Sequence, residues 1–177
     1  MADFNKTDNI QKLSPDFEVS ILKCPKALFR EAKFVFPFMQ SKAINSPEAV
    51  DWENSLIVIP TCQRAREDLV KVGPEIEAEK DRLLITFMDF GKSICENLIS
   101  QGYWADYIDP CSGLPMISPD CNKVYSEVDG IQICLQYKTM NCGCCKVLLH
   151  NEWGSSVYPA TVFTNAPLNL VNDITLR

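Results

Sequence analysis

Three of the nine cysteines in this 177-residue chain lie within four positions, at Cys142, Cys144 and Cys145. Thiolates are soft ligands that suit zinc, copper(I) and similar metals, and Gly143 allows a backbone to approach a bulky ligand closely. Lys146 follows directly, and a neighbouring cation favours thiolate over thiol. This thiol turn is therefore the first candidate for a site of chemistry.

Spacing alone leaves three interpretations of the thiol turn open. A closed zinc site needs four ligands, although vicinal cysteines rarely both bind one zinc. The residues nominally available for it are Cys142, Cys144, Cys145 and His150. A redox pair is the second interpretation, although adjacent cysteines are not the C-x-x-C helix-start arrangement of oxidoreductases. In the third, these are packed strand thiols, because free cysteine behaves as a small buried hydrophobe.

His150 is the only histidine, so a nucleophilic relay would rest wholly on it. At the end of an expected strand, a histidine is more often a hydrogen-bonded structural residue than a catalytic base. The aromatic stretch 102–107 can stack on a planar ligand, but such a stripe more often belongs to a core or a sheet surface.

Charge and hydropathy exclude several classes of protein. Seventeen Lys and Arg against 23 Asp and Glu give a net charge of −6, which argues against a duplex nucleic-acid binder. No apolar run approaches the roughly 20 residues that span a bilayer. The polar stretch Met1–Gln11 has no signal-peptide pattern, and an odd number of cysteines is a poor disulfide framework. We therefore expect a cytoplasmic chain with neither nucleic acid nor membrane as a partner.

One long helix is the clearest element. Apolar residues recur at helical spacing over 75–100, acidic residues crowd its first turn, and Gly102 follows its end. Before it, the pattern predicts a strand over 16–22, a helix over 25–36 and a buried strand over 56–59 that is bounded by Pro60.

The last third predicts antiparallel strands over 103–108, 131–137, 145–150 and 157–163, joined by turns. Trp104 and Asp106 then share one face of the first of these strands, and we expect Asp106 to anchor the turn 109–113 by accepting backbone N–H groups. The fold class that follows is α+β, an antiparallel sheet with packed helices. We expect one domain over 16–177, after a disordered or poorly ordered segment over 1–15.

Three motifs in one order resemble a known family. Residues 102–114 read GYWADYIDPCSGL, residues 143–147 read GCCKV with His150 shortly after, and residues 163–166 read FTNA after Trp153-Gly154. This pattern is similar to that of the cobalamin trafficking proteins of complementation group D, the methylmalonic aciduria and homocystinuria type D family. The resemblance covers roughly residues 16–168. Cys111 stands where the family pattern has Ser, and Cys142 is an additional thiol.

The resemblance implies a nitroreductase-like sandwich that lacks a flavin site, no enzymatic activity, and no cofactor bound by the isolated chain. It implies an adaptor that binds the cobalamin-processing type C protein and directs cobalamin to methionine synthase and to methylmalonyl-CoA mutase. By the same resemblance, Cys144 is the thiolate ligand to the cobalt of partner-bound cobalamin, and Cys145 is the second choice. The alternative is a thiol-dependent reductase or a flavoenzyme on the same scaffold.

The resemblance also bears on localisation. The long amino-terminal region of the family carries the mitochondrial signal, and this sequence has no counterpart to it. We therefore expect a mitochondrial form only with such a region.

Overall fold

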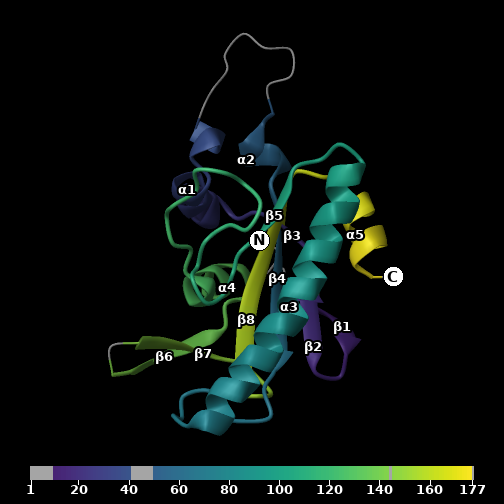
Figure 1. The fold of residues 1–177 in the computed structure, drawn as a ribbon. Helices are drawn as coiled ribbons and strands as arrows, with labels where there is room; N and C mark the ends of the chain where they lie inside the picture. The colour runs from purple at the N-terminus through teal and green to yellow at the C-terminus, as the bar shows by residue number, and fades with distance from the viewer. Residues whose placement is uncertain (1–9, 41–49, 144, 177) are drawn as a thin grey trace, which may run out of the picture.

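An antiparallel sheet runs through the middle of the molecule, with strands in the order β1-β2-β4-β8-β5 (Figure 1). The computed structural model describes residues 10–40, 50–143 and 145–176. The strands of this sheet are β1 (Ile10–Ser14), β2 (Phe17–Ser20), β3 (Leu22–Lys23), β4 (Ile57–Arg64), β5 (Ala105–Tyr107) and β8 (Val157–Thr164). The short strand β3 pairs with β4 beside β2. All of their pairings are antiparallel, as the sequence predicts.

The amino-terminal boundary differs from the prediction of a poorly ordered segment over 1–15. Residues 10–14 form β1, which pairs with β2 in a register that sets Ile10 opposite Ser20. The prediction is wrong for these residues, because a neighbouring strand satisfies their backbone groups. Residues 1–9 lie outside the described part of the chain.

Pro60 lies inside a central strand, whereas the sequence predicts that the strand ends there. Strand β4 continues to Arg64, and Pro60 pairs with Thr161 of β8. On the other side of β4, β3 pairs with residues 57–58 and β2 with residues 61–63. Pro60 therefore lies where the flanking strand is interrupted, which is where its missing N–H costs no ladder bond.

One face of the sheet is covered by α3 (Pro74–Ser100), which confirms the predicted long helix. Its buried residues Phe87, Ile94 and Leu98 pack with Tyr107 of β5 and with β8 in one core cluster. The helix ends before Gly102, whose φ of +86° is the left-handed conformation that favours glycine after a helix. The carboxyl-terminal α5 (Leu168–Thr175), which has no counterpart in the sequence prediction, packs on the same face.

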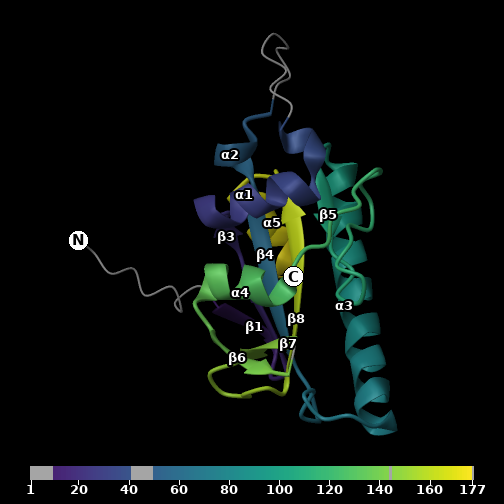
Figure 2. The ribbon, with the colours of Figure 1, turned by 90° about the vertical axis from the view of Figure 1, so that its left-hand side faces the viewer.

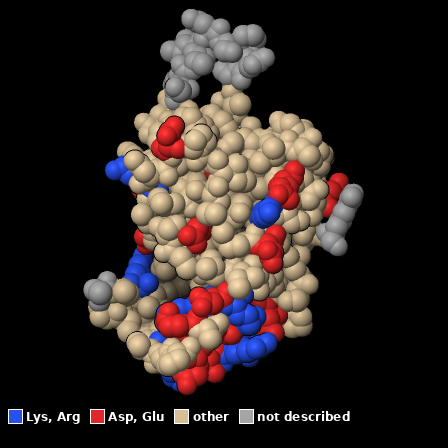
Figure 3. Space-filling view, in the orientation of Figure 1, with Lys and Arg blue, Asp and Glu red and all other residues tan. Residues whose placement is uncertain are grey.

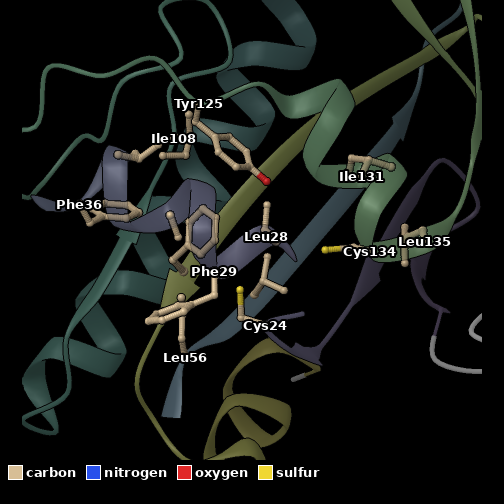
Figure 4. Packing of buried hydrophobic residues seen from close by; sticks show 14 of the residues in the cluster. Cys24, Leu28, Phe29, Phe36, Leu56, Ile108, Tyr125, Ile131, Cys134 and Leu135 are labelled. Atoms are coloured by element: carbon tan, nitrogen blue, oxygen red, sulfur yellow. The ribbon is translucent and has the colours of Figure 1, made fainter. Parts of the chain in front are cut away.

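The opposite face is covered by α1 (Lys26–Val35) and α4 (Glu127–Leu135), as the turned view shows (Figure 2). On this face, Leu28, Phe36 and Leu56 belong to a second core cluster (Figure 4). Phe163 of β8 is part of the same cluster. The short helices are η2 (Pro37–Gln40) and α2 (Trp52–Ser55). The predicted helix over 25–36 is thus confirmed within a residue at each end, and the α+β class is established.

Helix α4 replaces the strand that the sequence predicts over 131–137. The hydroxyl of Ser126 accepts from the backbone N–H of Asp129 at 3.3 Å, which caps the amino end of the helix. Ile131, Cys134 and Leu135 are spaced for one helical face and are buried against the core. A short run of apolar and β-branched residues is compatible with a strand and with a helix. The cap at Ser126 favours the helix.

A separate two-stranded sheet is formed by β6 (Lys138–Cys142) and β7 (Cys145–Leu149), which lie beside α4 (Figure 1). Charged side chains of both signs interleave over the end of the molecule where α3 begins (Figure 3). In the described part of the chain, no helix combines the length and the apolar character that crossing a bilayer requires.

Candidate thiol site on the β6–β7 hairpin

The thiol turn lies at the tip of the β6–β7 hairpin. Cys142 and Cys145 pair across the two strands and both are exposed. Gly143, in the turn, has a φ of +60°, and a β-carbon there would meet no atom within 4 Å. Glycine is therefore favoured here by the backbone conformation and not by lack of space. The preferred candidate, Cys144, lies outside the described residues.

The two faces of the hairpin have different surroundings. Alternation places Leu148 and Lys146 on one face, and Leu148 is buried in the core cluster beneath α4. The other face carries Met140, Cys142 and Cys145, all of them exposed. Directly opposite residues of an antiparallel pair point to the same side, so the two cysteine side chains share the outward face.

Lys146 is bound to α4. Its Nζ donates to Asp129 Oδ1 at 2.7 Å and to Gln132 Oε1 at 2.5 Å. The bond from Lys146 lowers the pKa of the Asp129 carboxyl. Because this ammonium lies on the inner face and is paired there, the geometry gives no support to the prediction that Lys146 activates a neighbouring thiol.

His150 closes the base of the hairpin as a structural residue, as the sequence favours. Its Nε2 lies 2.9 Å from Glu18 Oε2, and its ring stacks on Trp153 with centroids 3.9 Å apart. Its Nδ1 accepts from the backbone N–H groups of Glu152 and Trp153, so in the neutral ring Nε2 carries the proton and donates to Glu18. Both nitrogens are engaged, which leaves neither for zinc.

Metal-ligating side chains do not converge elsewhere in the described ranges, where no three His, Cys, Asp or Glu residues form a group that could hold an ion. Strand geometry separates His150 from Cys145 by about 3.3 Å per residue over five residues, or about 16 Å. The nominal zinc set therefore cannot close through His150.

The buried thiols differ sharply from those on the hairpin. Burial raises the pKa of Cys24 to about 12, and it raises the pKa values of Cys62 and Cys95 further above the ordinary range. These three are inert packing residues at neutral pH. Exposed thiols in the described ranges are Cys111, Cys142 and Cys145, and the last two lie together on the hairpin.

Asp106 is an anchor, although for a different segment from the one predicted. It is fully buried, and its carboxylate accepts from the backbone N–H groups of Tyr107, Met116, Ile117 and Ser118 at 2.7–3.0 Å. The turn 109–113 is held by Asp109 instead, which accepts from Cys111 and Ser112. Asp106 therefore fixes the 116–118 segment on the outer edge of β5.

A buried polar cluster between α4 and the sheet escaped the sequence prediction. Glu127 Oε2 accepts from the Thr161 hydroxyl at 2.5 Å. Glu127 Oε1 is buried and has no hydrogen-bond partner among the described residues. Burial raises the pKa of Glu127 to about 8, so this carboxyl is mostly protonated at neutral pH. The sequence analysis predicts no helix at this position, and an acidic residue usually marks a solvated one.

Comparison with known proteins identifies a family to which this chain is similar. Residues 2–174 match the model of the family described as methylmalonic aciduria and homocystinuria type D protein. Curated relatives named cobalamin trafficking protein CblD are similar over most of this chain. The protein from Gallus gallus is 34% identical over 149 residues, that from Rattus norvegicus 35% over 149, and that from Homo sapiens 33% over 149.

These alignments cover 84% of this chain but 46% of each of the three relatives. The chain thus spans about half the length of the curated relatives it matches. The matched region includes the hairpin with its thiols and the core that carries it.

Proposed function

Because the chain belongs to the methylmalonic aciduria and homocystinuria type D family, we propose that it is a cobalamin trafficking adaptor that offers a cysteine thiolate to cobalt. The observation that carries the proposal is the hairpin tip, where Cys142 and Cys145 are exposed together while Cys24, Cys62 and Cys95 are buried. A side chain that binds a metal held by another protein must project from the core of the protein that supplies it. The hairpin projects in this way.

The chemistry requires one soft donor and no metal cage. A corrin supplies the equatorial ligands of cobalt, so a protein can contribute only an axial one, and a thiolate suits that position. The thiol loses its proton to solvent, and a sulfur lone pair takes the axial position from the ligand that occupied it. We assign this role to Cys144 and keep Cys145 as the second choice.

The partner that we propose is the cobalamin-processing type C protein, which would hold the corrin while the hairpin reaches the cobalt. The destinations are methionine synthase in the cytosol and methylmalonyl-CoA mutase in mitochondria. The name shared by the relatives, cobalamin trafficking protein, favours this role over turnover. We further propose that the sheet with its helices is a nitroreductase-like sandwich without a flavin site, and that the isolated chain catalyses no reaction.

The test is a visible-absorption titration of the cobalamin-loaded type C protein with this chain. The parent chain should change the cobalamin spectrum, and Cys144→Ser should abolish the change while the fold stays intact. Cys145→Ser should have the smaller effect. Cys111→Ser is the matched control, because it removes an exposed thiol away from the hairpin. An unchanged spectrum with the parent chain would refute the adaptor role.

The alternative, a thiol-dependent reductase or flavoenzyme, has a separate readout. It requires the purified chain to retain flavin or to oxidise a nicotinamide cofactor. Stoichiometric flavin in chain purified without added cofactor would favour the alternative over the adaptor.

A further inference from the structure

Two side chains of α4 hold the hairpin that carries the thiols. Asp129 Oδ1 accepts from Lys146 Nζ on β7. Gln132 reaches both strands, because its Oε1 accepts from Lys146 Nζ while its Nε2 lies 3.5 Å from Thr139 Oγ1 on β6. We call Asp129, Gln132 and Lys146 the hairpin latch.

The contacts of Lys146 act on the half of the hairpin that is nearest the tip, whereas Thr139 lies opposite Leu148 near the base. At the base, the hairpin is fixed by buried Leu148 and by His150, which meets Glu18. Lys146 is only one residue from Cys145, so its contact with α4 restrains the strand next to the thiols. A two-stranded hairpin is marginally stable in water by itself, so its orientation depends on such contacts.

Helix α4 is a firm support for the latch. Its first turn is capped by Ser126, which accepts from the backbone N–H of Asp129. Gly130 and Ile131, next to Asp129, are buried in the packing of α4. The latch thus joins the two-stranded β6–β7 hairpin to a helix that is packed into the core.

We propose that Asp129 and Gln132 are positioning residues, which set the orientation of the hairpin that carries the thiol turn towards the cobalt. This inference rests on the proposed function. Their effect is on the approach of the sulfur and not on its ionisation, because Lys146 is paired on the inner face. Fixing a binding element in advance lowers the entropy lost on association.

The experiment compares four variants in the same absorption titration. Asp129→Ala with Gln132→Leu removes both side-chain acceptors from α4, and Lys146→Met removes the donor. Lys138→Met is the matched control, because it removes the same charge from the outward face of the same hairpin. Lys146→Arg keeps a donor and should rescue the parent behaviour.

The latch variants should raise the titration midpoint about two- to fivefold, the range expected for exposed charge-assisted contacts. Two further readouts should not move. The band at saturation should match that of the parent, because the same sulfur binds, and the pH dependence should be the same. A midpoint within error of the parent, or a shifted pH dependence, would overturn the positioning role.

Hydrogen exchange keeps the two proposals distinguishable, because it needs no cobalamin. The double variant should exchange faster over 138–142 and 145–149, while β4 and β8 keep the protection of the parent. If the parent chain gives no spectral change, the adaptor role fails, yet the exchange still tests the latch. Unchanged hydrogen exchange in the hairpin of the double variant would refute the proposed role of the latch, whatever the titration shows.

Discussion

His150 and Glu18 lie 132 residues apart in the chain, yet their side chains meet at 2.9 Å in a buried contact. The pair joins β2 of the central sheet to the end of β7, so it ties the base of the thiol hairpin to the core. Lys12 Nζ lies 3.5 Å from the other oxygen of Glu18 and is half exposed. The carboxylate therefore has a partner on each side.

Replacing the histidine should destabilise the fold. His150→Ala leaves Glu18 buried with only Lys12 beside it and opens a space under Trp153. We expect a loss of about 2–4 kcal/mol in the free energy of unfolding, measured by urea denaturation. Lys138→Met, at the exposed start of β6, serves as the control and should change little. A His150→Ala protein as stable as the parent would show that the pair contributes nothing.

Glu127 should make stability depend on pH. Its folded pKa of about 8 lies above its ordinary value of 4.5, so the folded chain binds the proton more tightly than the unfolded chain. The contribution of the Glu127 carboxyl to stability should therefore be most favourable below pH 4.5 and should decrease as the pH rises towards 8. The full penalty is about 2–5 kcal/mol.

The Glu127→Gln variant removes that group and should flatten this slope. At pH 8–9 it should be more stable than the parent in urea denaturation, and the difference should shrink as pH is lowered. Glu96→Gln, an exposed position on α3, is the matched control. Parallel pH profiles for Glu127→Gln and the parent would mean that the carboxyl is not held protonated.

Asp106→Ala should lower stability by about 1–3 kcal/mol, because it leaves the backbone N–H groups of Tyr107, Ile117 and Ser118 without this acceptor, while that of Met116 still donates to Tyr107 O. Its affinity for the type C protein, measured well below the melting temperature, should change little. Asp109→Ala, which loosens only an exposed turn, should cost less. A stable Asp106→Ala chain that no longer binds the partner would place Asp106 in the interface.

Gly91 is required where α3 crosses β5. A β-carbon at this position would come within 2.9 Å of the Tyr107 ring. Alanine usually stabilises a helix interior relative to glycine, but here the clash should outweigh that gain. Gly91→Ala should therefore lower the melting temperature, while Ser93→Ala on the exposed side of the same helix should not. An increase for Gly91→Ala would show that Tyr107 moves aside freely.

The sequence predicts well those elements whose pattern is local. The 75–100 helix follows from its apolar period, and the alternation of Trp104 and Asp106 places them on one face as observed, with Trp104 packed in the core on the α1 side. It fails at α4, because a short apolar run suits a strand equally well. For the site, the turn at Gly143 and the strand after it are predicted, whereas the strand before it lies at 138–142 and not at 131–137. The pattern leaves the exposure of Cys142 and Cys145 open, and the contact between Lys146 and α4 depends on a helix that the pattern misses.

The features that the sequence does not predict depend on contacts between residues that are distant in the chain. Nothing local in the sequence pairs His150 with Glu18, or shows that Glu127 is buried beside Thr161. Such polar contacts depend on how the layers pack, and the packing is decided by the whole core.

The place of β8 in the sheet has a consequence for biosynthesis. It is the last strand in the sequence but lies between β4 and β5, and Thr61 pairs with Ala160 at a separation of 99 residues. Until the ribosome has released residues 157–164, β4 lacks one neighbour and β5 its only partner in the sheet. Topology of this kind folds slowly and exposes strand edges that can aggregate, so the nascent chain should depend on molecular chaperones until residues 157–164 have left the ribosome.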